Sequence, residues 1–451
     1  MSNIIVFMSD EHNPRYSSPY GHDFVDTPNM QWLADNGTLF DNAYCPSPLC
    51  VPSRSAFLTG KRVHAVQAYG NNRAGIPAET HGLGAVLADE DVHTTFVGKV
   101  HAYRPSTELG FSETIETHEG ASGFDEGQQR RPLAVREGAD QRFDRYGPHE
   151  PPWGRDLGFM DAAVEWLQTR APALQRPWVL YVNLVRPHFP HYCTQELWDR
   201  YRADGDLPQH DVESATAQHP YAVDLRTHFQ LDNVPEEHVR GLRRGYYACV
   251  SFIDEQLGRL LSALTEADLA STTNLVYTSD HGEMLGKFGL WWKCNLLEDA
   301  ARIPCIAAGP DFAPGVRVAT PVDLHDLQAS VFAVTGASHP ASWLGTPLQD
   351  LATDDGDRVV FAEYHGHGTR AGSFMVRRGD WKLIHNIAAP DQLFDLGNDP
   401  EELDNRLDAN PNQAKELAAA LAEVCDPEAE DQKAEAFWEQ QVELHRREST
   451  A

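Results

Sequence analysis

Cys50 begins the segment whose residue types and spacing are best suited to chemistry. The segment reads Cys50-Val51-Pro52-Ser53-Arg54 and continues to a Thr-Gly pair at residues 59 and 60. Pro52 is favoured as a first helical residue and Gly60 is placed to end the helix, so the pattern predicts a short helix with Cys50 at its N-terminus. Free N–H groups there favour an anion, and Arg54 lies one turn further along the same face. We predict a reactive cysteine beside a fixed cation; the alternative is a buried thiol before an ordinary helix.

A candidate metal site is formed by polar residues that directly follow two apolar runs. These residues are Asp10, Glu11, Asp280 and His281. In open α/β sheets, sites form outside the carboxyl ends of the strands. Carboxylates select hard cations such as Ca²⁺ and Mg²⁺, and an imidazole also accepts Mn²⁺ or Zn²⁺. We predict that Asp10, Asp280 and His281 bind one divalent cation, with Glu11 as a possible fourth ligand. Ca²⁺ is the favoured ion. The alternative is that these acids only cap helices.

Two further apolar runs are also followed by polar residues. Lys99 and His101 follow one run, and His188 follows another. Residues at positions i and i+2 of an extended backbone share a face, so Lys99 and His101 are predicted to point the same way. The alternative for this pair is an ordinary surface strand end. The four strand ends together favour one polar site at one edge of a sheet.

Composition limits the classes of partner. Among 451 residues the chain has 37 Lys and Arg and 67 Asp and Glu, a net charge of -30. This charge argues against nucleic acid or an anionic membrane as a partner, and an anionic substrate would need a local cluster of cations. Seven cysteines without a framework spacing indicate reduced thiols. With no secretory leader and no apolar run long enough to span a bilayer, we expect a cytoplasmic protein.

The order of elements predicts an α/β fold with a large, mostly parallel sheet flanked by helices. Four short apolar runs are predicted strands: Ile4–Met8, Thr94–Val97, Trp178–Val185 and Asn274–Thr278. Three periodic segments between them are predicted helices: Pro28–Asn36, Phe159–Gln168 and Tyr246–Leu264. Alternation of strands with helices favours a parallel sheet covered on both faces.

From residue 371 onwards the apolar runs are short and separated by turns. We therefore predict a catalytic domain over residues 1–370 and a small antiparallel α+β subdomain with a helical tail over residues 371–451. Its predicted elements are strands at 373–376, 381–385 and 392–396 and helices at 412–424 and 426–447. Phe437 and Trp438 suggest that the tail docks on another surface, such as a second subunit of a homo-oligomer. The alternative is an ordinary surface helix. The aperiodic regions 118–156 and 203–237 are predicted to wall a pocket.

The Cys-x-Pro-Ser-Arg segment resembles that of the type I, formylglycine-dependent sulfatases of the alkaline-phosphatase superfamily. Gly98-Lys99-Val100-His101 and Pro187-His188-Phe189-Pro190 are similar to two further motifs of that family. The Asp280-His281 pair is similar to the choline-sulfatase and phosphonate monoester hydrolase branch. The resemblance covers roughly residues 3–407. Glu11 departs from it, since the family has Asp or Gln at that position.

The resemblance implies an alkaline-phosphatase-like fold and a modified nucleophile. A formylglycine-generating enzyme would oxidise Cys50 to Cα-formylglycine, whose hydrate is a geminal diol that attacks the sulfur of a sulfate ester. By the same resemblance, Lys99 and Lys293 hold the sulfate and His101 takes a proton when the intermediate breaks down. His188 faces the leaving group, and either His188, as a general acid, or Lys293 assists the departing alcohol.

The resemblance also leaves the substrate open. Asn71 matches a substrate-binding asparagine of the choline-sulfatase and phosphonate-hydrolase branch, and Trp153 with nearby aromatic residues could form a cation cage for choline. We expect hydrolysis of a small-molecule sulfate monoester. One alternative is a phosphonate monoester or phosphodiester hydrolase on the same scaffold. Another is a protein that binds sulfate esters without turnover, in which Cys50 stays unmodified.

Overall fold

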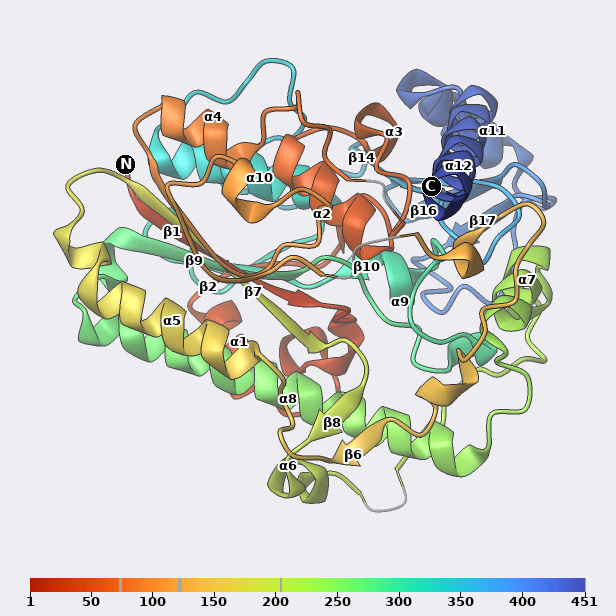
Figure 1. Cartoon of the computed structure of the whole chain (residues 1–451), viewed down its shortest axis with the longest axis horizontal. Helices are drawn as coiled ribbons and strands as arrows, with labels where there is room; N and C mark the ends of the chain where they lie inside the picture. The colour runs from red at the N-terminus through yellow and green to blue at the C-terminus, as the bar shows by residue number, and fades with distance from the viewer. Residues whose placement is uncertain (73–74, 121–123, 203–204, 451) are drawn as a thin grey trace.

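The computed structural model describes residues 1–72, 75–120, 124–202 and 205–450. Within these residues the largest sheet has eight strands, seen edge-on in Figure 1. Their order is β12 (Val316–Val318), β2 (Gly37–Phe40), β11 (Cys305–Ala308), β9 (Thr273–Ser279), β1 (Asn3–Asp10), β7 (Trp178–Pro187), β4 (His93–Lys99) and β5 (Glu113–His118). β11 runs against its neighbours and the other pairs are parallel, so the predicted mostly parallel sheet is confirmed.

Strand β1 shows why the sheet is covered on both faces. Successive side chains of a strand point to opposite faces. Ile5 and Phe7 belong to one core cluster, whereas Ile4 and Val6 belong to the other. A continuous apolar run therefore fits a central strand between two helical layers.

The two helical layers lie below and above the sheet in Figure 1. The lower layer is α1 (Pro28–Asp35), α5 (Asp156–Thr169) and α8 (Glu236–Glu266), and the upper layer is α2 (Cys50–Thr59), α4 (Leu83–Asp89) and α10 (Leu324–Thr335). The three predicted helices correspond to α1, α5 and α8, and α8 begins ten residues before Tyr246.

The predicted antiparallel subdomain is present. Its sheet has the order β14 (Val359–Tyr364), β15 (Ser373–Arg378), β16 (Trp381–Asn386) and β17 (Gln392–Asp395), and every pair is antiparallel. Helix α11 (Pro411–Val424) covers this sheet through Leu417 and Leu421. Because β14 precedes residue 371 and pairs with β15, the sheet crosses the predicted boundary, and that domain division stays a prediction.

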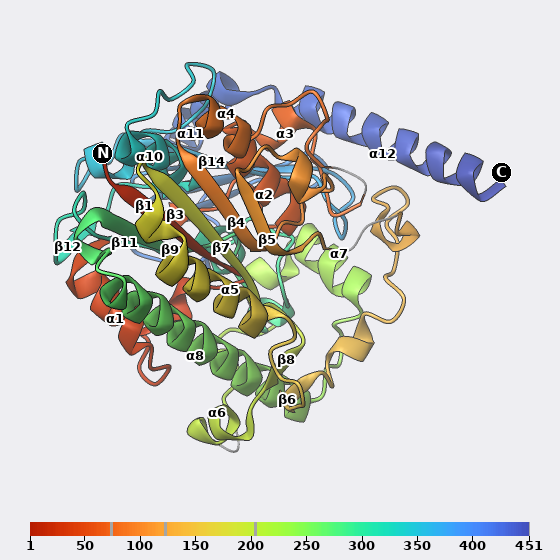
Figure 2. The ribbon, with the colours of Figure 1, turned by 60° about the vertical axis from the view of Figure 1, so that its left-hand side comes forward.

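The C-terminal helix α12 (Pro427–Thr450) extends from the body of the molecule in Figure 2. Near its middle, the ring of Phe437 lies 5.5 Å from that of Tyr69, and Trp438 Nε1 donates to the His365 carbonyl at 3.2 Å. The aromatic pair therefore packs on its own chain, and the homo-oligomer stays a prediction.

Helix α7 (Pro220–Phe229) lies inside a region predicted to be aperiodic. Its buried residues include Asp224, Arg226 and His228, which break the apolar period that would have revealed it. The remaining short elements are β3 (Ala43–Tyr44), α3 (Val63–Val66), β6 (Tyr146–Pro148), β8 (His191–Cys193), α6 (Gln195–Arg200), α9 (Glu298–Ala301), β10 (Arg302–Ile303) and β13 (Val322–Asp323). Among the described residues, no helix has both the length and the apolar character needed to cross a bilayer.

Candidate active site

Helix α2 places Cys50 at its N-terminus, as predicted. The helix begins at Cys50 itself and ends where Gly60 adopts a left-handed conformation with φ 64°. Pro52 is thus the third helical residue rather than the first, which costs no hydrogen bond because the first four N–H groups of a helix have no acceptor within it. The Cys50 side chain is only 1% exposed.

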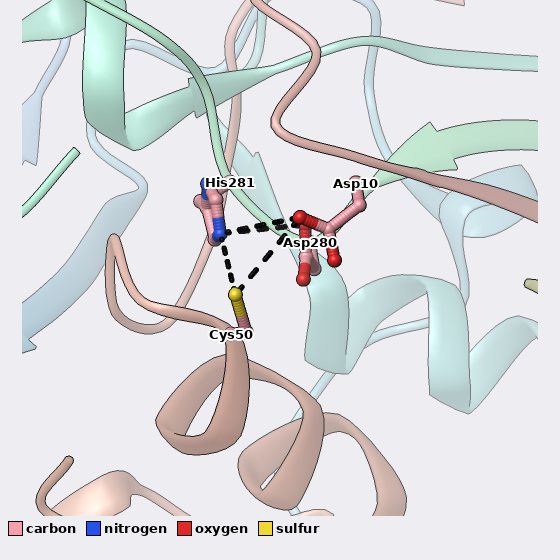
Figure 3. A group of neighbouring side chains, drawn as sticks. All are labelled: Asp10, Cys50, Asp280 and His281. Carbon is pink, nitrogen blue, oxygen red and sulfur yellow. Dashed lines mark hydrogen bonds and ion pairs between the residues drawn. The ribbon is translucent and has the colours of Figure 1, made fainter. Parts of the chain in front are cut away.

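Four side chains from three elements converge on one point, shown in Figure 3. Asp10, Cys50, Asp280 and His281 each offer an atom within 4.8 Å of the others. The register explains the meeting: Ser9 of β1 lies opposite Ser279 of β9, so the acids that follow both strands are neighbours.

The imidazole of His281 is oriented with Nε2 towards this point. Nδ1 lies 3.0 Å from the Gly282 carbonyl, which can only accept, so Nδ1 carries the hydrogen. Nε2 lies 3.2 Å from Sγ of Cys50 and 3.9 Å from Oδ1 of Asp10. Although burial lowers the pKa of His281, Asp280 and Cys50 raise it to about 9. The surroundings therefore favour positive charge at this position.

Glu11 lies at the edge of the same cluster. Its carboxylate is buried, and neither oxygen has a hydrogen-bond partner among the described residues. The carboxylate forms ion pairs with Lys293 Nζ at 3.0 Å and with His188 Nε2 at 3.5 Å. Unbonded carboxylate oxygens beside an aspartate pair and an imidazole are a donor set that fits one divalent cation.

Arg54 fixes the two aspartates rather than facing a free anion. Its Nε donates to Asp280 Oδ2 at 2.8 Å and its Nη2 donates to Asp10 Oδ2 at 2.9 Å. Lys99 Nζ also contacts Asp10. Although burial and Cys50 raise the pKa of Asp10, cations that include Lys99 and Arg54 hold it well below its usual range. Asp10 is therefore held ionised, whereas burial raises the pKa of Asp280 against the opposing effect of Arg54. The guanidinium fixes both carboxyl groups in one orientation.

Lys99 and His101 both reach the site, but not through an extended backbone. β4 ends at Lys99, and His101 has a φ of 46°, so the prediction of a shared strand face is wrong. Both ring nitrogens of His101 are buried without a hydrogen-bond partner among the described residues. Burial lowers the pKa of His101 to about 4, although nearby Cys50 raises it. His101 is therefore neutral at pH 7 and able to accept a proton.

The thiol of Cys50 is surrounded by cations. Burial raises its pKa, but Lys293, Lys99 and His281 lower it well below the usual value. An anion at this position, whether a thiolate or another group, is therefore strongly stabilised.

His188 and Lys293 lie on the Glu11 side of the site. His188 Nδ1 donates to the Phe189 carbonyl at 2.7 Å, which leaves Nε2 facing Glu11 and Asp10. The His188 side chain is 18% exposed, more than the other members of the cluster, so it borders the opening.

The side chain of Asn71 contacts the backbone of the segment that begins at Cys50. Its Oδ1 accepts from the Val51 N–H at 2.9 Å, and the Tyr103 hydroxyl donates to its carbonyl at 2.6 Å. Asn71 therefore braces the first turn of α2, and its predicted contact with substrate stays a prediction.

Two residues near the site, Glu283 and Arg142, were not predicted from the sequence. Glu283 Oε1 accepts from the N–H groups of Leu285 and Trp292, which fixes the loop that carries Lys293. Its signal was the acid two residues after His281. Arg142 lies over the rings of Phe189 and Trp292, beside the opening. It belongs to an aperiodic region, where no spacing marks it.

Trp153 does not offer a free aromatic face. Its ring stacks on Phe252 with centroids 4.0 Å apart and planes 11° apart, and the residue is 6% exposed. The predicted role of Trp153 in a cation cage is therefore wrong.

Known proteins are similar to this chain over most of its length. A family model described as Sulfatase matches residues 2–337, and one described as N-sulphoglucosamine sulphohydrolase, C-terminal, matches residues 286–428. The choline-sulfatase of Rhizobium meliloti (strain 1021) is 30% identical over 442 residues, which are 93% of this chain and 85% of that protein. Arylsulfatase K of Danio rerio is 26% identical, over 94% of this chain and 84% of that protein.

Solved structures show the same fold. The phosphonate monoester hydrolase of Agrobacterium radiobacter superposes with a TM-score of 0.73 at 19% identity, covering 94% of this chain and 95% of that one. BT4656, in complex with its substrate D-glucosamine-2-N,6-O-disulfate, superposes with a TM-score of 0.74 at 21% identity, covering 94% and 97%.

Proposed function

The chain belongs to the sulfatase family and is a sulfuric ester hydrolase, and on that premise we propose that it cleaves a sulfate monoester with a formylglycine nucleophile made from Cys50 and with one divalent metal ion. The observation that carries the proposal is the meeting of Cys50 with Asp10, Asp280 and His281 within 4.8 Å. A residue that must attack an anion is thereby placed among ligands for a cation.

The metal would be held by Asp10, Asp280 and His281, with Glu11 at the edge, and Ca²⁺ suits the oxygen-rich set best. Mn²⁺ and Mg²⁺ fit the same residues. When bound, it supplies positive charge that favours the ionised nucleophile and the tetrahedral anion.

The chain's own residues divide the remaining work. Lys99 and Lys293 flank Cys50 and neutralise charge on the sulfate oxygens. His188 lies at the opening, where it protonates the departing alcohol as one diol oxygen forms its bond to sulfur. His101 is neutral at pH 7 and takes the proton of the second hydroxyl, so that the carbon–oxygen bond to sulfate breaks and the aldehyde returns. Water then restores the hydrate.

The second candidate is hydrolysis of a phosphonate monoester or phosphodiester. It is favoured by the Asp280-His281 pair and by the likeness to a phosphonate monoester hydrolase. Lys99, Lys293 and His101 together favour sulfate, since a sulfate monoester has three unsubstituted oxygens to satisfy and a diester has two. Rates on a sulfate and a phosphonate ester with the same leaving group decide between the two.

Mass spectrometry of the peptide that contains Cys50 tests the nucleophile. Exchange of sulfur for oxygen with loss of two hydrogens lowers the mass by about 18 Da. Because hydration of the aldehyde restores nearly that mass, the digest is also treated with a hydrazide that labels only the aldehyde. An unmodified, unlabelled cysteine in active enzyme contradicts the proposal. The same result in inactive protein supports the alternative of binding without turnover.

We place this enzyme in the cytoplasm. All seven cysteines lie in the described part of the chain and are free thiols, which agrees with a reducing compartment. A formylglycine-generating enzyme is then its partner in maturation.

A further inference from the structure

Arg142 is held over aromatic rings beside the candidate active site. Its guanidinium carbon lies 4.6 Å from the ring centre of Phe189, 4.7 Å from that of Trp292 and 5.8 Å from that of Phe229. A flat guanidinium stacks favourably on such rings. The rings therefore fix the position of this cation without using its hydrogen-bond donors.

Those donors have no partner in the part of the chain that the structure describes. No carboxylate there lies within ion-pair distance of Arg142, whereas Arg136 on the same loop donates to Asp125 Oδ2 at 2.9 Å. Burial, and then repulsion from Arg136, lower the pKa of Arg142 to about 10 against the opposing effect of Glu11. The side chain is thus charged at neutral pH and half-buried, which is a costly arrangement without an anion.

The ring of Phe189 connects this cation to the reaction centre. Lys293 Nζ lies 5.3 Å from the same ring centre that carries Arg142. Phe189 follows His188, which borders the opening, and Trp292 precedes Lys293. Arg142 therefore lies on the leaving-group side of the site, one aromatic ring away from a sulfate-binding lysine.

This arrangement opposes a cationic leaving group such as choline. The faces of Phe189 and Trp292, which could hold a quaternary ammonium, already hold a guanidinium. A second cation would have to displace Arg142 or stay beside it against charge repulsion.

We propose that Arg142 is a specificity-determining residue that binds a second anionic group, carried by the leaving group of the sulfate ester. The proposal rests on the sulfatase function proposed above and names the substrate class: an organic sulfate whose alcohol part bears a carboxylate, sulfate or phosphate. The guanidinium fork matches such groups with two parallel hydrogen bonds.

The test compares 3-carboxyphenyl sulfate with its neutral isostere 3-carbamoylphenyl sulfate, together with the 4-substituted pair and choline sulfate. The variants are Arg142→Met, which keeps an apolar stem over the rings, and Arg142→Lys, which keeps the charge. Arg145→Gln is the matched control, since it removes one exposed charge from the same loop. Each variant is compared with wild type on each ester, so differences in leaving-group reactivity cancel.

We expect Arg142→Met to lower kcat/KM about tenfold or more for at least one carboxylate ester, mainly through KM, and less than about threefold for its carbamoyl partner. Arg142→Lys keeps part of the preference, and Arg145→Gln changes neither ester by more than about twofold. If Arg142→Met lowers kcat/KM equally for the charged and the neutral ester, and Arg142→Lys restores both equally, Arg142 has a structural role and the proposal is overturned. A wild-type preference for choline sulfate overturns it as well.

Binding separates this proposal from the sulfatase function. Calorimetry with Cys50→Ala protein measures affinity for 3-carboxyphenyl sulfate and for the carbamoyl ester in the presence and absence of the Arg142→Met change. A charge-selective loss of affinity supports the subsite even where formylglycine-bearing enzyme turns over no sulfate ester. Turnover without any charge-selective effect leaves the sulfatase function standing and removes the subsite.

Discussion

The Nε2 atom of His281 lies 3.2 Å from the Sγ atom of Cys50, although the two residues are 231 positions apart in the chain. His281 follows β9 and Cys50 begins α2, so this contact exists only after the sheet and its upper helical layer have assembled. The placement of the proposed nucleophile beside the proposed metal ligands therefore depends on the whole fold.

Replacement of Cys50 tests the nucleophile directly. Cys50→Ala should lower kcat by several orders of magnitude while folding and metal content stay unchanged, because the side chain supplies the attacking atom. Cys50→Ser should sulfate itself at most once, since serine has no second hydroxyl with which to expel sulfate. Steady-state rates and intact-protein mass measure both outcomes. Near-wild-type turnover in either variant contradicts a formylglycine nucleophile.

Removal of divalent metal should abolish activity, and readdition should restore it. Glu11→Gln is the sharper change, since its buried oxygens have no hydrogen-bond partner among the described residues and the amide oxygen can still coordinate. We expect metal affinity to fall about tenfold, with activity recovered at higher metal concentration. Metal titration followed by calorimetry measures this. Full activity in metal-free protein would show that the cluster is structural.

Lys99→Ala should reduce the preference for sulfate over phosphonate esters. The lysine lies beside Cys50 and Asp10. In the variant, one equatorial oxygen of the bound sulfate would lose its positively charged partner. The loss is roughly 1–3 kcal/mol for the sulfate ester and less for an ester with fewer free oxygens. The ratio of kcat/KM values on two esters with one leaving group measures it. A wild-type preference for the phosphonate would make the second candidate function correct.

The pair of His64 and Glu363 joins α3 to β14 and should make stability depend on pH. His64 Nδ1 lies 2.9 Å from Glu363 Oε1. Burial lowers the pKa of His64, but the hydrogen bond that His64 donates to Glu363 raises it above its ordinary value overall. A raised histidine pKa stabilises the fold below the unfolded value near 6.5 and loses this effect as pH rises through the folded value.

His64→Gln should therefore be destabilising by about 1–3 kcal/mol near pH 6, and the difference from wild type should shrink as pH rises. Urea unfolding at several pH values measures this. The exposed His81→Gln is the control and should leave the pH profile unchanged. A difference that grows with pH would have the wrong sign for this pair.

The central strands and the meeting of Asp10 with Asp280 could be predicted because both depend on local pattern. β1 and β9 are continuous buried runs, and the acids that end them are adjacent once the strands pair in parallel. The beginning of α2 was misplaced by two residues, since Pro52 is tolerated anywhere in the first turn.

What could not be predicted depends on contacts between distant segments. Helix α7 buries charged residues against partners elsewhere, so its apolar period is weak. The left-handed backbone of His101 is imposed by its surroundings and has no signal in a non-glycine residue. Arg142 is significant only because three aromatic rings from other segments surround it.

The burial of α2 limits when the thiol of Cys50 can be modified. All ten residues from Cys50 to Thr59 are buried, so the finished protein presents no extended segment that a modifying enzyme could bind. The proposed oxidation of Cys50 would then have to compete with folding during or soon after synthesis, and a molecule that folds first would keep its thiol. The active fraction of a preparation would then depend on the rate of Cys50 oxidation relative to the rate of folding. Slower folding at low temperature should raise this fraction.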